Sequence, residues 1–165
     1  MTSYRLVIGI IVGVIFSFFS AFFFNMGVIL NQIELHAGGD VLKIAALLVG
    51  ANFDFNMISF IIDPLQSPAV LGFFAPEILA WIFIGFISGT IAKGLKRGVI
   101  VSSLVVVIVL LLWIILSIIS GEDLMTLFQG TQLFETLGGI LSAFVGVLIG
   151  GSIGGLLSGP YEEFY

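Results

Sequence analysis

Long apolar runs without a single charged residue are the feature that most limits what this chain can fold into. The runs 99–119 and 137–158 contain no Asp, Glu, Lys or Arg. A helix needs about 20 apolar residues to cross the hydrocarbon core of a bilayer, and both runs reach that length. Only 9% of the 165 residues are charged, whereas soluble domains carry about 25%. The chain has too few charges to cover a water-facing surface, so lipid is the solvent that suits it.

Two further apolar runs complete the set. The run 6–30 is uncharged, and the shorter run 78–92 ends against Lys93. The apolar part of the first run is too long for the core of a cleaved signal peptide, so we expect a retained helix. We predict an all-α integral membrane protein, a single domain over residues 1–165, built as a bundle of four transmembrane helices. A segment at 34–76 joins helices one and two, and a short loop at 120–136 joins helices three and four.

The segment 34–76 is unusually apolar for a loop. Its part 41–62 could be read as a fifth span, but it contains Lys43 and Asp54. A charge at the middle of the membrane costs about 2.5–3.5 kcal/mol on insertion scales. We therefore predict an apolar interfacial or re-entrant segment, in which Asp40 caps a short helix because Asp is a preferred N-cap residue. If Asp54 dips into the membrane it needs a partner, and Lys43 is the candidate.

Four of the five basic residues predict the orientation: Arg5, Lys93, Lys96 and Arg97. With four spans they lie on one side of the membrane, which the positive-inside rule makes the cytoplasmic side. Both termini are then cytoplasmic in a multi-pass protein of the cell membrane. A fifth span would place Arg5 on the side opposite the other three residues, which disfavours it.

Small residues recur at intervals of four along several of these helices. Residues four apart lie on nearly the same face of a helix. Small residues let membrane helices approach closely, as in small-xxx-small or glycine-zipper contacts. The pattern therefore favours helix packing, within the chain or between copies, over a pore lining. The residues concerned are Gly9, Gly13, Ser17 and Ala21 in the first helix, Gly85 and Gly89 in the second, and Gly138, Ser142, Gly146, Gly150, Gly154 and Ser158 in the fourth.

The third helix has large apolar residues through its middle. We expect this part to face lipid or a bulky partner, while helices one, two and four form the tight core. Trp81 stands one turn inside the second helix, where an interfacial aromatic residue would lie.

Candidate binding residues are few. Glu34, His36 and Asp54 in the segment 34–76 could contact a ligand or partner, but one histidine with two carboxylates does not make a metal site without converging geometry. Cysteine is absent and His36 is the only histidine, so no metal site, cofactor or catalytic residue is predicted, and we do not expect an enzyme. Five basic residues form no nucleic-acid footprint.

The leading hypothesis is therefore a non-catalytic accessory or scaffolding subunit of a larger membrane complex. Its partners would be the lipid bilayer and other membrane subunits or copies of itself. One alternative is a small channel or transporter formed by a homo-oligomer. Another is a membrane-anchored binding module that uses the segment 34–76.

Overall fold

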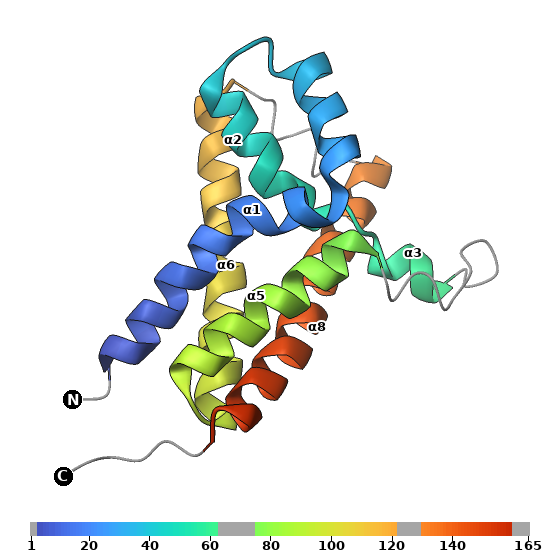
Figure 1. Cartoon of the computed structure of the whole chain (residues 1–165). Coiled ribbons are helices and arrows are strands. Elements are labelled where there is room, and N and C mark those ends of the chain that lie inside the picture. The colour runs from blue at the N-terminus through green and yellow to red at the C-terminus, as the bar shows by residue number, and fades with distance from the viewer. Residues whose placement is uncertain (1–2, 63–74, 122–129, 160–165) are drawn as a thin grey trace.

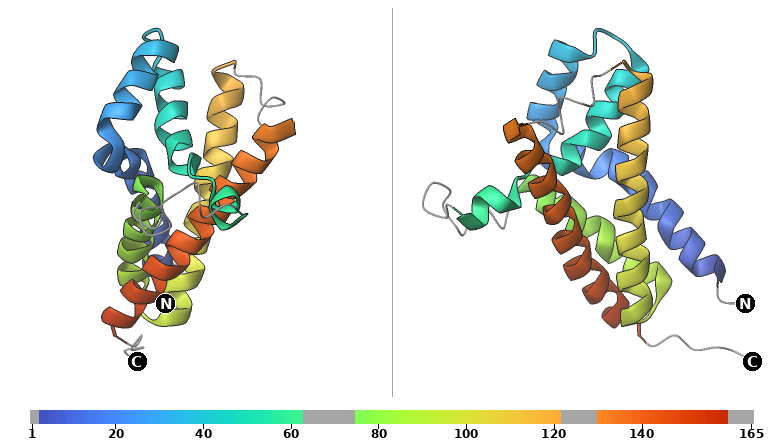
Figure 2. Two further views of the ribbon diagram at one scale, coloured as in Figure 1. Left: turned by 90° about the vertical axis from the view of Figure 1, so that its right-hand side faces the viewer. Right: turned by 180° about the vertical axis from the view of Figure 1, so that it is seen from behind.

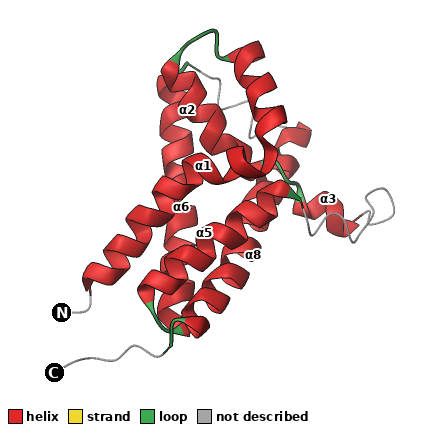
Figure 3. Ribbon diagram, in the orientation of Figure 1, coloured by secondary structure: helices red, strands yellow, loops and turns green. Residues whose placement is uncertain are grey.

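The chain is built from helices alone wherever its structure is described (Figure 3). The computed structural model describes residues 3–62, 75–121 and 130–159. No strand occurs in these three ranges. The elements are α1 (Ser3–His36), α2 (Val41–Gly50), the 3-10 turn η1 (Ala51–Phe53), α3 (Met57–Ile62), α5 (Pro76–Ala92), α6 (Leu95–Ile119) and α8 (Gly130–Leu157).

Within the described ranges, four stretches are long and apolar enough to cross a membrane. Four is also the predicted number, but the four stretches are not the four that were predicted. They are Tyr4–Phe24, Val41–Ile62, Leu95–Ile119 and Gln132–Leu157. The predicted second helix, 78–92, is the shorter helix α5 with 17 residues. The stretch Val41–Ile62 is broken into α2, η1 and α3 rather than one helix.

Helices α5, α6, α8 and the first half of α1 lie side by side in one part of the molecule (Figure 1). The last turns of α1 and the antiparallel α2 form a hairpin beyond the N-terminal end of α5. We call residues 28–50 the α1–α2 hairpin. The short helix α3 contacts α8 and projects from the side of the bundle (Figure 1; Figure 2, right).

Several predicted boundaries shift. Helix α1 continues to His36, so the segment between the first two predicted helices begins later than residue 34. Helix α8 begins at Gly130, so the predicted loop 120–136 is partly helix, and residues 122–129 of that loop lie outside the described part. The predicted cap is confirmed: Asp40 accepts a hydrogen bond from the Leu42 amide at 2.9 Å and begins α2.

One glycine face of α8 lies directly against the main chain of α5. A Cβ atom added to Gly150 would overlap the Ile82 carbonyl oxygen, and one added to Gly154 would overlap that of Phe86. The Cβ of Trp81 would stand 2.6 Å from a Cβ at Gly146. These positions therefore leave no room for a side chain.

A second face of α8 contacts the start of α6. A Cβ at Gly155 would lie 2.7 Å from the Gly94 carbonyl oxygen, and the Gly94 amide donates to the Gly155 carbonyl at 3.1 Å. On the neighbouring helix, a Cβ at Gly89 would lie 2.6 Å from the Gly151 carbonyl oxygen. Helix α8 is thus held between α5 and α6, backbone against backbone.

The remaining predicted packing residues lie at other contacts. Gly13 of α1 faces Val105, at 2.6 Å from an added Cβ, and Gly9 faces Val101 at 3.0 Å. Ser142 is buried and donates to the Gly139 carbonyl at 2.7 Å. The others are placed as follows: Gly85 faces Val147, Gly138 faces Asn56, Ser17 is buried in α1, Ser158 follows α8 and donates to Gly155, and Ala21 belongs to α1 with a side chain outside the described part.

Two predictions about large residues are wrong. The middle of α6 does not face only lipid or a partner, because Val105, Val106 and Val109 are fully buried in the core. Its other face, with Leu104, is exposed. Trp81 is not at a surface: it is 0% exposed, because its indole fills the centre of the bundle.

The buried residue Asn52 joins three helical elements, two through its side chain and one through its main-chain carbonyl. Its amide nitrogen donates to the carbonyl oxygens of Ser17, at 2.8 Å, and Val49, at 3.1 Å. Its amide oxygen accepts from the Ser20 hydroxyl at 3.3 Å. The Asn52 carbonyl accepts from the Trp81 indole at 2.7 Å. A polar group in an apolar core is stable only when its hydrogen bonds are made, and Asn52 makes them to α1, α2 and α5.

Helix α1 bends in its middle (Figure 1). The Ser17 carbonyl, which an undisturbed helix pairs with the amide of residue 21, accepts the Asn52 amide. Insertion of a side chain into this ladder is a recognised cause of helix kinks. The bend lets the two halves of α1 serve different parts of the molecule.

Replacing Gly150 by alanine should destabilise the fold, because the new methyl group overlaps the α5 backbone. Overpacking of this kind costs about 1–3 kcal/mol. The matched control is Gly27→Ala in α1, where nothing lies within 4 Å of the added Cβ. That change should be neutral or stabilise the protein by about 0.5–1 kcal/mol. Unfolding of the purified protein in detergent, followed by circular dichroism, measures both. Equal stabilities of the two variants would contradict the close contact.

Asn52→Ala should cost roughly 2–3 kcal/mol of stability, because it leaves buried groups without partners. Alanine keeps the main-chain carbonyl that Trp81 uses, so the substitution tests the side-chain amide alone. Asn31→Ala, at an exposed position of α1, is the control and should change stability by less than about 0.5 kcal/mol. The same unfolding measurement compares the two variants. If the Asn52 variant is as stable as the Asn31 variant, the Asn52 amide does not stabilise the fold.

Candidate functional site

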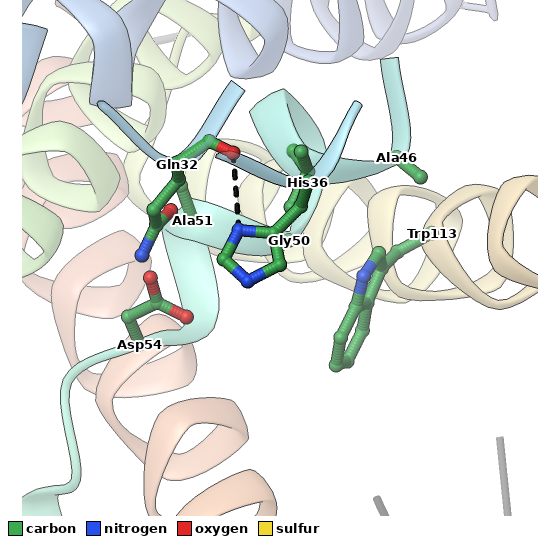
Figure 4. A pocket seen from close by; sticks show the side chains of 8 residues that line it. Gln32, His36, Ala46, Gly50, Ala51, Asp54 and Trp113 are labelled. Carbon is green, nitrogen blue, oxygen red and sulfur yellow. Dashed lines mark hydrogen bonds between the residues drawn. The ribbon is translucent and has the colours of Figure 1, made fainter. Parts of the chain in front are cut away.

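A cavity of about 240 Å³ lies where the end of α1, α2, η1 and α6 meet (Figure 4). It is smaller than the roughly 300–1,000 Å³ of sites for drug-sized ligands, so it suits a small molecule or a single chemical group. Its lining combines apolar and polar side chains. The lining residues are Gln32, His36, Ala46, Leu47, Gly50, Ala51, Asp54 and Trp113.

The last turn of α1 orients His36. Its Nδ1 lies 3.2 Å from the main-chain carbonyl oxygen of Gln32, one helical turn earlier. A carbonyl oxygen only accepts, so Nδ1 carries the proton of this bond, and Nε2 of the neutral ring is an acceptor. Figure 4 shows Nε2 pointing into the cavity, between Asp54 and Trp113. The Gln32–His36 spacing places both side chains on one helix face.

Asp54 follows η1 directly, at the point where the chain leaves the helical turn. Its carboxylate points towards the side-chain amide of Gln32 (Figure 4). Among the described residues, the Asp54 carboxylate makes no hydrogen bond or ion pair. Lys43, the partner predicted for it, is not a cavity residue. The carboxylate is therefore presented to the cavity with its acceptor sites unused by this part of the chain.

Trp113 forms the aromatic wall. The Phe53 ring stacks on it with centroids 5.4 Å apart and an interplanar angle of 21°. Phe53 also contacts Trp81, at 5.3 Å between centroids. Gly50 leaves room for the indole, because an added Cβ would lie 2.6 Å from its Nε1. The wall is thus fixed from behind by the core of the bundle.

The structure brings together two of the three predicted contact residues. His36 and Asp54 line the cavity, whereas Glu34 is exposed elsewhere on α1. Within the described ranges no three His, Cys, Asp or Glu side chains are grouped as metal ligands would be.

Sequence reasoning missed Gln32, Trp113 and the supporting Asn52. The four-residue spacing of Gln32 and His36 was a readable signal. Trp113 lies 59 residues beyond Asp54 in the chain, and only the fold brings it to the cavity.

The lining favours a ligand that donates hydrogen bonds. The Asp54 carboxylate and the free His36 nitrogen accept, and the aromatic face of Trp113 attracts positive charge. None of the described residues that line the cavity is Lys or Arg, so an anionic group finds no cationic partner among them.

No known protein family, curated protein or solved structure matches this chain.

Proposed function

We propose that this chain is a multi-pass membrane protein that acts as a non-catalytic accessory or scaffolding subunit of a larger membrane complex. The observation that carries the proposal is the exposed apolar surface of the α1–α2 hairpin. In this proposal helix α5 sets the depth of the bilayer, so this surface lies outside the membrane, although the stretch Val41–Ile62 is long and apolar enough to cross one.

Helix α5 sets the depth of the bilayer in this proposal. Its 17 residues measure about 26 Å at 1.5 Å per residue, close to the roughly 30 Å of a hydrocarbon core. Glu77 stands in its first turn and Lys93 follows its last residue, so charged residues mark both ends. The first half of α1, α6 and α8 run beside α5 and would share its membrane.

The α1–α2 hairpin lies beyond the N-terminal end of α5 (Figure 1). It nevertheless carries large apolar side chains, with Leu35 exposed by 71% and Val41 by 74%. Val28, Leu30 and Leu42 are exposed as well. On α1 below the bend such residues would face lipid, but on the hairpin they would face water. Large apolar patches that neither lipid nor the protein core covers are typical of protein–protein contacts.

The charge pattern supports the orientation. Arg5 lies in the first turns of α1, and Lys96 and Arg97 lie in the first turn of α6. The start of α1, the end of α8 and the α5–α6 turn at Lys93 all lie at the same end of the molecule (Figure 1). The positive-inside rule places that end in the cytoplasm and the α1–α2 hairpin outside.

A homo-oligomeric channel lined by glycine faces is not favoured. The glycine faces of α5 and α8 are filled by each other's backbone within one chain, so they are not available to line a path between copies.

A membrane-anchored binding module is the second candidate, and the cavity favours it. Its polar residues converge from α1 and from the turn after η1, next to an aromatic wall on α6. Such convergence in a concave site is typical of small-ligand binding. The two candidates are compatible, because the cavity and the exposed apolar residues use different parts of the hairpin.

The orientation can be measured by cysteine labelling, since the chain contains no cysteine of its own. Glu34→Cys and Lys96→Cys place single thiols at exposed positions at opposite ends of the molecule. We expect a membrane-impermeant maleimide to label residue 34 on intact cells, and residue 96 only after permeabilisation. Labelling of both thiols from the same side would contradict the proposed topology.

The subunit role predicts that Leu35→Glu combined with Val41→Glu releases a partner chain. Both side chains are exposed, so the fold should persist while a desolvated contact is lost. Isolation in mild detergent, followed by identification of the associated chains, compares this variant with Glu34→Gln, which should keep the complex. A wild-type protein that purifies as a solitary monomer would refute the role, as would a partner retained equally by both variants.

A further inference from the structure

We propose that the cavity between α1, α2 and α6 binds an alkylammonium group, with its charge on the Asp54 carboxylate and its carbon chain against the Trp113 indole. The inference rests on the second candidate function, the binding module, and is independent of the subunit role.

The charge of the lining determines the sign of the ligand. Among the described residues that line the cavity, Asp54 is the only Asp, Glu, Lys or Arg, and its ionised carboxylate is negative. Glu77, in the first turn of α5, is near enough for its charge to act on Asp54. Like charges repel one another, and a cation bound to Asp54 reduces the repulsion between Asp54 and Glu77.

The acceptors of the cavity determine the kind of cation. An alkylammonium group has N–H bonds to donate, unlike a quaternary ammonium group. Asp54 and the Nε2 atom of His36 both accept, and Figure 4 shows them on the same side of the cavity. Charge-assisted hydrogen bonds are about twice as strong as neutral ones. A cation with N–H donors therefore binds this cavity more tightly than a cation without them.

The remaining walls suit a short carbon chain. Ala46, Leu47 and Ala51 are apolar, and the Trp113 ring is held in place by Phe53. An indole face attracts a nearby cation and also packs against methylene groups. The small volume of the cavity limits the ligand to a few carbon atoms beyond the ammonium group.

Two sources could deliver this group, a free amine or the headgroup of an aminophospholipid. Both present the same ammonium chemistry. In the proposed topology the cavity lies near the outer surface of the membrane, within reach of either source.

The test uses the full chain in phosphatidylglycerol nanodiscs and n-butylammonium as the probe. The chain has two tryptophans, and Trp81 is fully buried, so a saturable change in fluorescence that Trp113→Phe abolishes reports on the cavity. Asp54→Asn should weaken binding at least about tenfold, which corresponds to the loss of one hydrogen bond to a charged group. Asp54→Glu keeps the charge and should bind more tightly than Asp54→Asn.

Glu34→Gln is the matched control, because it removes one carboxylate from the same segment but not from the cavity. It should leave binding within about twofold of wild type, since exposed charges outside the site contribute little. Circular dichroism confirms that each variant is folded. If Asp54→Asn fails to fold, competition between butylammonium, tetramethylammonium and butyrate on the wild-type protein still decides the question.

The outcomes separate the claims. Butylammonium binding that exceeds tetramethylammonium and butyrate binding supports the proposal. If nanodiscs of phosphatidylethanolamine abolish that binding, the group comes from the lipid; if they do not, it comes from a free amine. Equal binding of butyrate or n-butanol would overturn the ammonium assignment while leaving a binding module. Absence of binding by every probe in both lipids would overturn the module as well.

Discussion

The hydrogen bonds of Asn52 connect the two parts of this molecule. One part is the group of helices α5, α6, α8 and the start of α1, and the other is the α1–α2 hairpin. The Asn52 side chain reaches the Ser17 carbonyl and the Ser20 hydroxyl, and its carbonyl receives the Trp81 indole. In an apolar surrounding these bonds have no competition from water, so they fix geometry more strongly than they would at a surface. These bonds hold η1, which Asp54 follows directly, against α1 and α5.

The close contact of α8 with α5 and α6 contributes in a different way. Glycine has no side chain to fill space. It contributes by letting two helix backbones come into direct contact, as at Gly150 and Gly155. Dispersion contacts grow with the number of atoms in reach, and close backbones bring many together. The large side chains of α6 fill space elsewhere in the core, where Val105 and Val109 belong to the same buried cluster as Trp81. The bundle therefore combines two kinds of packing: direct contact between helix backbones at glycine, and contact between large apolar side chains.

The helices could be predicted from sequence because the apolar runs are local features. The predicted range 99–119 lies within α6, and the predicted range 137–158 lies almost wholly within α8. Their ends could not be predicted, because a helix continues past the last apolar residue wherever its backbone bonds remain favourable, as α1 does to His36.

The candidate site was predicted only in part. His36 and Asp54 stood out as polar residues in an apolar segment, but Trp113 reaches them only through the fold. The role of Asn52 could not be predicted, because its buried amide meets the Ser17 carbonyl of α1 only through the fold.

The unequal lengths of the helices have a consequence for the membrane itself under the proposed topology. Helix α5 is about 26 Å long, whereas α6, with 25 residues, is about 37 Å at the same rise per residue. A bilayer matched to α5 forces α6 to tilt or to extend beyond it, and one matched to α6 draws Glu77 towards hydrocarbon. Hydrophobic mismatch is relieved by tilt, by local thinning or by association. The protein would then sense bilayer thickness through α5, the shortest of the four helices assigned to the membrane, and thinner membranes or a thinned annulus of lipid would be its preferred surroundings.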